Sequence, residues 1–280
     1  MTRPTSDDAE DPGENPSDGT EIDPTESADD SADSNGEPAI VATDLTRVYG
    51  ETTAVSGLDL EVDVGSVYGL LGPNGAGKTT TIRMLTALTP PTRGSGTVAG
   101  VPITDRESLV DRVGYLPESP PIYEQLTARE QLEYYGGLCG MDASAIEARM
   151  EPLLERLDLA ADADDRIVTY SKGMRRKTGL VQAILPAPDV VFLDEPTAGL
   201  DPRAARTVRE LVTELADAGT TVVLSTHILS VVETVATEVG ILRAGELVAE
   251  GAPKDLRERL EERTDPTLED VVLEVTTDAE

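Results

Sequence analysis

Residues 67–80 read VYGLLGPNGAGKTT, and this stretch decides the fold. An apolar strand pattern leads into a glycine-rich loop, residues 72–80, and a helical pattern continues to Leu88. Between a strand and a helix, the loop pattern G-x-x-x-x-G-K-[ST] can bind phosphate for physical reasons. Its glycines let successive backbone N–H groups face an anion, and the new helix adds its positive N-terminal end. The stretch therefore predicts a site for the phosphates of a nucleoside triphosphate.

The loop supplies groups that fit a magnesium–triphosphate complex. Lys78 can reach the β- and γ-phosphates, and the hydroxyl of Thr79 can bind Mg²⁺. Backbone N–H groups at the start of the helix favour the same anion. We predict contacts with the nucleotide from every residue of the loop: Gly72, Pro73, Asn74, Gly75, Ala76, Gly77, Lys78, Thr79 and Thr80.

Two acidic residues follow an apolar run further along the chain. Residues 190–193 read VVFL, which is typical of a strand buried on both faces, and Asp194 and Glu195 come directly after it. Ligands of open α/β sheets bind at the carboxyl ends of the strands, so we expect both carboxylates beside the glycine-rich loop. We predict that Asp194 supports Mg²⁺ through a water molecule. Glu195 is predicted to act as general base, or at least to orient the water that attacks the γ-phosphate.

The composition is strongly acidic. The 280 residues suffice for a sizeable core and carry a net charge of −31, with thirteen Asp and Glu against one Arg in residues 1–38. Only four of the 23 basic residues are lysines. This composition resembles that of proteins adapted to high intracellular salt, as in halophilic archaea, where concentrated salt screens the self-repulsion. Nucleic acid is not an expected partner, because no basic stripe is present to displace phosphate counterions.

Cysteine content and hydropathy indicate a cytoplasmic protein. The single cysteine, Cys139, cannot form an internal disulfide, which fits a reducing compartment. No apolar run approaches the ~18 residues needed to span a bilayer. The polar, acidic N-terminus does not have the pattern of a secretory signal.

The chain divides into three regions. Residues 1–38 contain almost no apolar residues, so they cannot offset the entropy of ordering, and we predict a disordered extension. A specific acidic docking tail is the alternative for this segment. A folded region is expected over residues 39–252, and residues 253–280 are expected to form a C-terminal helix and tail.

Strand and helix patterns alternate in the folded region, which predicts an α/β core around a parallel sheet. The β-rich start and the helical middle are expected to form separate lobes, and residues 127–130, TARE, match a helix-starting capping box. The expected strands are 40–48, 54–64, 67–71, 96–101, 112–116, 190–193 and 221–225, with a hairpin at 239–243 and 246–249 and a strand-like tail at 268–276. The expected helices are 79–88, most of 127–160, 171–185, 202–218, 228–235 and 253–263.

The order of these motifs resembles the nucleotide-binding subunit of an ABC transporter over about residues 39–250. Residues 170–174, YSKGM, resemble the signature motif of that family, which is usually LSGGQ. Residues 198–201, AGLD, resemble its D-loop, and His227 resembles its switch histidine. The resemblance implies a P-loop NTPase fold of the ABC-ATPase type. This fold has a RecA-like core, an N-terminal antiparallel β subdomain and a helical signature subdomain, here at about residues 119–185.

The resemblance also implies ATP and Mg²⁺ as cofactors and gives further residues a role. Tyr49 would stack on adenine with Ala54 and Val55 beside it, and His227 would contact the γ-phosphate during hydrolysis. Ser171 and Gly173 would bind the ATP held by a partner subunit. Glu118 takes the loop position that is usually Gln, where it would contact Mg²⁺ or water through oxygen; while ionised it cannot donate a hydrogen bond.

Two departures from the family pattern bear on the subtype. Lys172 and Met174 differ from LSGGQ, but Ser171 and Gly173, the positions that contact phosphate, remain. The variants GYLPE at residues 114–118 and YSKGM resemble subunits of exporters whose permeases are separate chains. The tail at residues 267–274 resembles the end of those subunits too.

The expected function is that of an ATP-binding subunit, which hydrolyses Mg·ATP in a head-to-tail dimer and drives a separate membrane permease, with export favoured over import. The permease would attach the subunit to the inner face of the cell membrane. Residues 119–141 would form part of the contact with the permease. We expect two copies of this chain to pair, and a heterodimer remains the alternative. Two other functions compete: a non-transport ABC ATPase acting on nucleic acid or ribosomes, and a regulator that binds ATP without cleaving it.

Overall fold

The computed structural model describes residues 37–258 and 267–277, so nearly all of the extension predicted to be disordered lies outside the described residues. The strands are β1 (Ile40–Tyr49), β2 (Thr52–Val62), β3 (Val67–Leu71), β4 (Arg93–Val98), β5 (Val101–Pro102), β6 (Val113–Leu116), β7 (Val190–Asp194), β8 (Thr221–Ser225), β9 (Glu238–Arg243) and β10 (Glu246–Gly251). The α-helices are α1 (Lys78–Leu85), α2 (Arg106–Leu109), α3 (Ala128–Leu138), α4 (Ala143–Arg156), α5 (Lys172–Ile184), α6 (Pro202–Asp217), α7 (Leu229–Val235), α8 (Pro253–Glu258) and α9 (Leu268–Thr277). Among these helices none is both long and apolar enough to cross a membrane.

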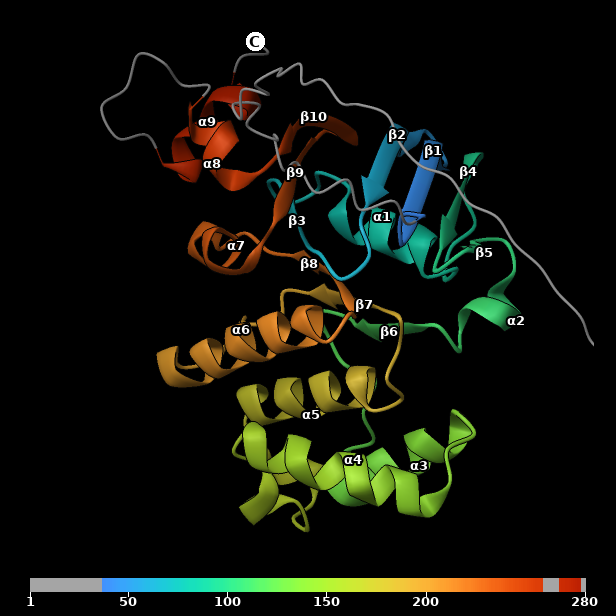
Figure 1. Cartoon of the computed structure of the whole chain (residues 1–280), viewed down its shortest axis with the longest axis vertical. Coiled ribbons are helices and arrows are strands. Elements are labelled where there is room, and N and C mark those ends of the chain that lie inside the picture. The colour runs from blue at the N-terminus through green and yellow to red at the C-terminus, as the bar shows by residue number, and fades with distance from the viewer. Residues whose placement is uncertain (1–36, 259–266, 278–280) are drawn as a thin grey trace, which may run out of the picture. The chain divides into compact units, whose positions relative to one another are not determined.

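A six-stranded sheet carries the glycine-rich loop. Its order is β10-β9-β3-β8-β7-β6, and all neighbours are parallel except the hairpin β9–β10 (Figure 1). Every residue of β3, β7 and β8 is buried, as expected for strands covered on both faces. Because the strands are parallel, the ends of β3, β7 and β8 meet at one edge, where Asp194 pairs in register with Ser225. The predicted α/β fold is confirmed.

The first strands form a separate antiparallel sheet in the order β2-β1-β4-β5. β1 pairs with β2 from Ile40 opposite Val62 to Tyr49 opposite Thr52, so Tyr49 lies at the turn between them. The expected strand at residues 96–101 is found earlier and split in two, as β4 and β5 around a turn at Ala99 and Gly100, both with positive φ. This sheet packs on α1 and shares a core with one face of the parallel sheet.

The helical middle is anchored to the parallel sheet through α5. The predicted capping box begins α3: Thr127 Oγ1 accepts from the Glu130 N–H at 3.1 Å, and the Thr127 N–H donates to Glu130 Oε2 at 2.9 Å. The helical stretch predicted for residues 127–160 is two helices, because the chain turns at Gly140, whose φ is +72°. α3 and α4 pack on each other and on α5, which packs on β6 and β7.

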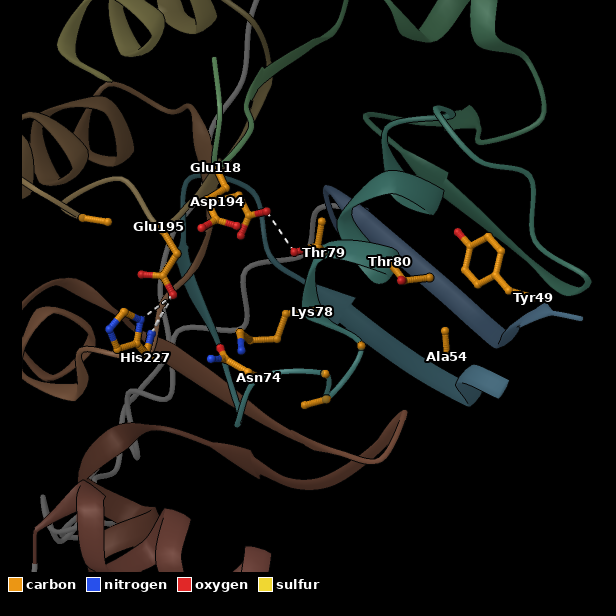
Figure 2. Close-up of a pocket in the computed structure, with 14 residues that line it drawn as sticks. Tyr49, Ala54, Asn74, Lys78, Thr79, Thr80, Glu118, Asp194, Glu195 and His227 are labelled. Carbon is orange, nitrogen blue, oxygen red and sulfur yellow. Dashed lines mark hydrogen bonds and ion pairs between the residues drawn. The ribbon is translucent and has the colours of Figure 1, made fainter. Parts of the chain in front are cut away.

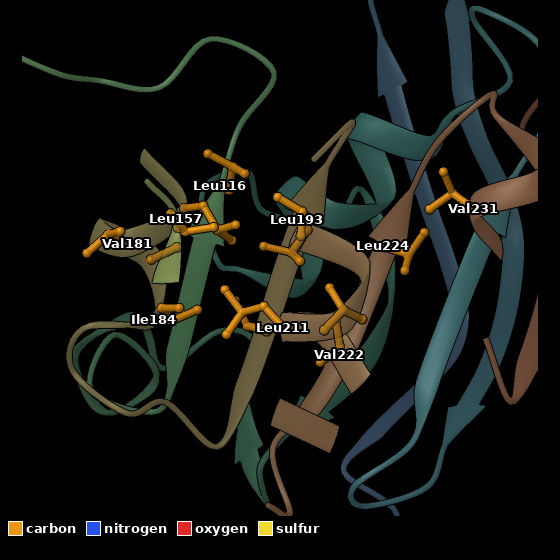
Figure 3. Close-up of a cluster of buried hydrophobic side chains, with 14 of the residues drawn as sticks. Leu116, Leu157, Val181, Ile184, Leu193, Leu211, Val222, Leu224 and Val231 are labelled. Atoms are coloured by element: carbon orange, nitrogen blue, oxygen red, sulfur yellow. The ribbon is translucent and has the colours of Figure 1, made fainter. Parts of the chain in front are cut away.

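Two hydrophobic cores cover the two faces of the parallel sheet. Figure 3 shows part of the first, in which Leu193 of β7, Leu224 of β8, Val181 of α5 and Leu211 of α6 are all buried. The second lies between the antiparallel sheet, α1 and the opposite face, and it includes Phe192. Because both faces of the parallel sheet are covered, the polar functional residues lie at the edge formed by the carboxyl ends of its strands.

The expectation of a strand-like tail at residues 268–276 is wrong, because residues 268–277 form helix α9. Leu268 and Val271 are buried, and Val272 and Val275 pack beside them, so the apolar residues follow the spacing of one helical face. The Leu268 N–H donates to Glu233 Oε1 at 3.2 Å, and Arg243 Nη1 donates to the Val275 carbonyl at 2.6 Å. The helix expected at 253–263 is observed as α8, and residues 259–263 lie outside the described residues.

Candidate nucleotide-binding site

The glycine-rich loop is tightly folded between β3 and α1. Gly77 has φ +110°, and a Cβ on it would lie 2.6 Å from the Ala54 carbonyl oxygen. A Cβ on Gly72, at φ +144°, would lie 2.3 Å from the Leu242 carbonyl oxygen. Only glycine fits both positions, since contacts this short would displace backbone. The Gly245 N–H donates to the Ala76 carbonyl at 2.9 Å, so the β9–β10 turn holds the loop as well.

Lys78 starts α1 and folds back over the loop. Its Nζ donates to the carbonyl oxygens of Gly72 at 2.6 Å and Pro73 at 3.1 Å, and the residue is 8% exposed. Burial lowers the pKa of the Lys78 ammonium, while the nearby carboxylates of Glu195 and Asp194 act in the opposite direction. Gly72 and Pro73 therefore position the lysine and do not line the pocket themselves.

Asp194 and Thr79 lie together, as predicted for a metal site. Asp194 ends β7 and is 3% exposed, and the Thr79 hydroxyl donates to its Oδ2 at 3.0 Å. The Ser225 hydroxyl donates to Oδ1. The described residues contain no cluster of three or more His, Cys, Asp or Glu that could hold a metal alone. This donor set fits Mg²⁺ bound with a nucleotide, because Mg²⁺ is usually held by one or two carboxylates plus phosphate oxygens.

Glu118 follows β6 and lines the same pocket as the loop. Its backbone carbonyl accepts a hydrogen bond from Arg176 Nη2, and Arg176 Nη1 donates to the Asp194 carbonyl at 2.9 Å. Arg176 is 2% exposed, and burial lowers the pKa of its guanidinium, which the nearby carboxylates of Glu118, Asp194 and Glu195 oppose. A buried arginine thus ties α5 to both acidic segments of the site.

Glu195 and His227 are in contact, although 31 residues separate them. Figure 2 shows the two side chains joined beside Lys78: the His227 N–H donates to Glu195 Oε1 at 3.0 Å, and Nδ1 lies 2.8 Å from the same oxygen. The Thr226 hydroxyl donates to Glu195 Oε2 at 3.0 Å. The Glu195 backbone has φ +53°, and its N–H donates to the Ser225 carbonyl at 2.8 Å.

These groups line one pocket of about 670 Å³, a volume suited to a nucleotide-sized ligand. At one end, the ring of Tyr49 is 42% exposed and carries the Arg47 guanidinium 4.5 Å from its centroid. Ala54 lines this end, whereas Val55 is fully buried and does not. The lining residues are Tyr49, Ala54, residues 74–80, Glu118, Asp194, Glu195, Ala198 and His227.

Ser171 and Gly173 are not among the residues that line this pocket. Ser171 is the N-cap of α5, and its hydroxyl accepts from the Met174 N–H at 3.2 Å. A Cβ on Gly173 would lie 3.3 Å from Leu200, so the start of α5 packs beside the 198–201 loop. The structure therefore brings the loop, the carboxylates, Tyr49 and His227 together and leaves these two residues apart.

Four polar residues of the site were missed in the sequence: Arg47, Arg176, Ser225 and Thr226. The last two follow the apolar run of β8 and end at the same sheet edge as Asp194, a placement that the strand pattern could have indicated. Arg47 lies two residues before Tyr49 on β1, and residues at this spacing share one face of a strand, so this contact could have been indicated by the strand pattern. Arg176 carries no local signal, because its partners lie on other segments.

A phosphate loop between β3 and α1, with carboxylates at the end of β7, the parallel strand beyond β8 in the same sheet, defines a P-loop nucleoside triphosphatase. Residues 55–198 match the family model described as ABC transporter. The chain belongs to this family as an ATP-binding domain, and it is an ATP hydrolase.

Known proteins resemble this chain in sequence and in structure. A daunorubicin/doxorubicin resistance ATP-binding protein of Streptomyces peucetius is 42% identical, over 79% of this chain and 68% of its own length. A Nod factor export ATP-binding protein of Paraburkholderia xenovorans is 40% identical, over 79% and 73%. A solved ATP-binding subunit of an ABC transporter superposes with a TM-score of 0.79 at 32% identity, covering 85% of this chain and 99% of that one.

Proposed function

We propose that this chain powers export: it hydrolyses Mg·ATP as one half of a head-to-tail dimer and drives a separate membrane permease. The observation that carries the proposal is the single pocket in which Lys78, Asp194, Glu195 and His227 meet. Relatives named for drug resistance and for Nod factor export support the direction of transport. The residues that line this pocket keep their predicted roles in this proposal.

In the proposed reaction each side chain acts at a stated atom. The Thr79 hydroxyl would bind Mg²⁺, and Asp194 would support the ion through a water molecule, with Glu118 nearby. An ion held there would supply positive charge against the phosphates. Lys78 Nζ would exchange its loop carbonyls for phosphate oxygens. Glu195 would take the proton of the attacking water. His227, whose Nδ1–H is held by Glu195, would in its imidazolium form donate from its other ring N–H to the γ-phosphate.

The dimer is proposed because Ser171 and Gly173 do not line the pocket of their own chain. The Ser171 hydroxyl and the free N–H groups of the first turn of α5 suit a phosphate that comes from elsewhere. We expect Glu195→Gln to dimerise on adding ATP, measured by size-exclusion chromatography with light scattering. Ser171→Arg in the same background should remain monomeric while still binding ATP; a monomer in both variants would count against pairing.

A groove of about 490 Å³ is the proposed docking place for a cytoplasmic helix of the permease. It is mostly apolar, with two arginines among its lining residues, which suits an amphipathic, acidic segment. It includes Ser119, Pro121 and Tyr135 from the stretch 119–141 predicted to contact the permease. Other lining residues are Arg83, Leu88, Arg106 and Val110, of which Leu88 and Val110 are 46% and 60% exposed.

A reconstituted system tests the transport proposal. A candidate permease in vesicles should stimulate the ATPase, whereas DNA or ribosomes should not. Leu88→Glu should abolish the stimulation and leave the basal rate unchanged. Val64→Glu, at an apolar position that is 64% exposed and outside the groove, is the matched control. Stimulation by ribosomes or DNA alone would favour the non-transport reading, and absence of any turnover would favour a regulator.

Three further features belong to the proposal: two copies of this chain in the dimer, attachment to the inner face of the membrane through the permease, and a salt-adapted, archaeal source. The acidic composition supports the salt-adapted source, since the net charge is −31 and the pI about 4.2. Co-purification from membranes with a hydrophobic partner would support the attachment, and mass analysis of the complex would show whether the two ATP-binding subunits are identical.

A further inference from the structure

The carboxylate of Glu195 is held by three donors from one short segment, residues 226–227. Oε1 accepts two hydrogen bonds, from the His227 N–H at 3.0 Å and from Nδ1 at 2.8 Å. Oε2 accepts one, from the Thr226 hydroxyl at 3.0 Å. An ionised carboxylate offers about four acceptor positions, two on each oxygen. The position that remains is therefore on Oε2, the oxygen that Thr226 holds.

The direction of the Thr226 hydroxyl is fixed as well. The Ile228 N–H donates to Thr226 Oγ1 at 3.0 Å, so the hydroxyl proton is directed to Glu195. Thr226 is fully buried, and its bond is protected from water. The side chain of His227 is 64% exposed, so water competes for its bond to Glu195. Of the two side-chain donors, the buried hydroxyl is the better fixed.

We infer that Thr226 is a positioning residue, which orients Oε2 of Glu195 as the oxygen that takes the proton from the attacking water. The inference rests on the proposed role of Glu195 as the base. Thr226 does not line the nucleotide pocket, so it should affect the rate of hydrolysis and not the binding of ATP. A hydroxyl is required, whereas the methyl group of the threonine is not.

Variants of the full chain, assayed for ATP hydrolysis at high salt, test this. Thr226→Val should lower kcat about tenfold with KM for ATP unchanged, which is the effect of losing one hydrogen bond to a charged group. Thr226→Ser should restore kcat to within about twofold of the parent, since it keeps the hydroxyl. Thr226→Ala serves as the second hydroxyl-free variant if the valine variant does not fold, and thermal melting reports folding for each.

Thr221 provides a matched control. It lies at the opposite end of β8, is fully buried, and its hydroxyl bonds only backbone: it accepts from the Gly65 N–H at 3.0 Å. Thr221→Val should change the melting temperature but leave kcat as in the parent. A similar loss of kcat in the Thr221 and Thr226 variants would overturn the inference, because it would show a general effect of burying valine.

A double-mutant comparison separates this inference from the proposed function. In single-turnover hydrolysis, Thr226→Val should add no further loss to Glu195→Gln, because the two residues act through one carboxylate. An inactive Glu195→Gln together with a fully active Thr226→Val would overturn the inference alone. A fully active Glu195→Gln would remove the base role, and with it both the proposed mechanism and the role of Thr226.

Discussion

At the scale of single residues, Glu118 is the most unusual member of the site. It lines the nucleotide pocket with two other carboxylates, Asp194 and Glu195, beside a ligand that is itself strongly negative. The buried Arg176 offsets part of this charge, because it bonds the backbone of both acidic segments and lies within electrostatic reach of all three acids. A carboxylate at position 118 is therefore tolerated in this chain with a specific counter-charge close by.

Glu118→Gln tests whether this carboxylate binds the metal. If it does, the variant should need a severalfold higher Mg²⁺ concentration for half-maximal ATPase activity, since an amide oxygen is a weaker ligand for Mg²⁺ than a carboxylate. Titration of Mg²⁺ at fixed ATP measures the requirement, with Glu124→Gln as the control outside the pocket. An unchanged Mg²⁺ requirement with a lower KM for ATP would show that Glu118 acts only through its charge.

A second acidic residue, Glu238 at the start of β9, predicts a pH effect on stability. Burial raises its pKa, and Glu250, Asp63 and Glu61 raise it further. The folded state therefore binds the proton more tightly than the unfolded state, so ionisation destabilises the fold as the pH rises through the folded pKa. Glu238→Gln should raise the melting temperature at pH 7 by about 1 °C.

The gain should disappear at a pH below the ordinary glutamate pKa of about 4.3, where the parent side chain is neutral in both states. Glu246→Gln, at an exposed position of the same hairpin, is the control. An equal gain from both variants, or one that persists in acid, would show that the pKa of Glu238 is not responsible.

At the scale of elements, α9 closes the apolar surface formed by α7, α8 and the sheet. Leu268 is fully buried there, and Val271 is 3% exposed. Leu268→Ala should lower the free energy of unfolding by about 2–4 kcal/mol, the usual cost of such a cavity. Leu273→Ala, where the side chain is 54% exposed, should cost less than about 1 kcal/mol. Urea unfolding followed by circular dichroism measures both, and equal small losses would mean that α9 does not support the core.

The same helix shows where sequence reasoning succeeds and fails. The phosphate loop and the capping box at Thr127 were predicted because their sequence signals are local: Lys78 bonds Gly72 and Pro73, and Thr127 bonds Glu130. In α9 the valines and threonines favour a strand, whereas the spacing of Leu268, Val271 and Val275 favours a helix, and packing on α7 and α8 decides between them. The contact of Thr226 with Glu195 depends on the register of β7 and β8, which no local pattern specifies.

At the scale of the whole molecule, the acidic charge should make stability depend on salt. With a net charge of −31, repulsion is strong when the screening length is about 10 Å, at 0.1 M salt, and weak when it is about 3 Å, at 1 M. We expect the melting temperature to rise by at least about 5 °C from 0.1 M to 2 M KCl. Chloride is the suitable anion, because sulfate also strengthens apolar burial. A melting temperature independent of KCl would contradict the screening argument and remove the main support for salt adaptation.

The folded-back Lys78 has a calorimetric consequence. Contacts within the chain hold the glycine-rich loop closed, since Lys78 bridges the Gly72 and Pro73 carbonyls and Gly245 bonds Ala76. Arrival of a phosphate then exchanges one set of polar partners for another and orders little new chain. Nucleotide binding by one copy of this chain should therefore show a small heat-capacity change, far from the values of coupled folding and binding. The heat of titration would report the exchange of charge partners. A large negative heat-capacity change is expected only from a step that buries much apolar surface, such as closure of the proposed dimer.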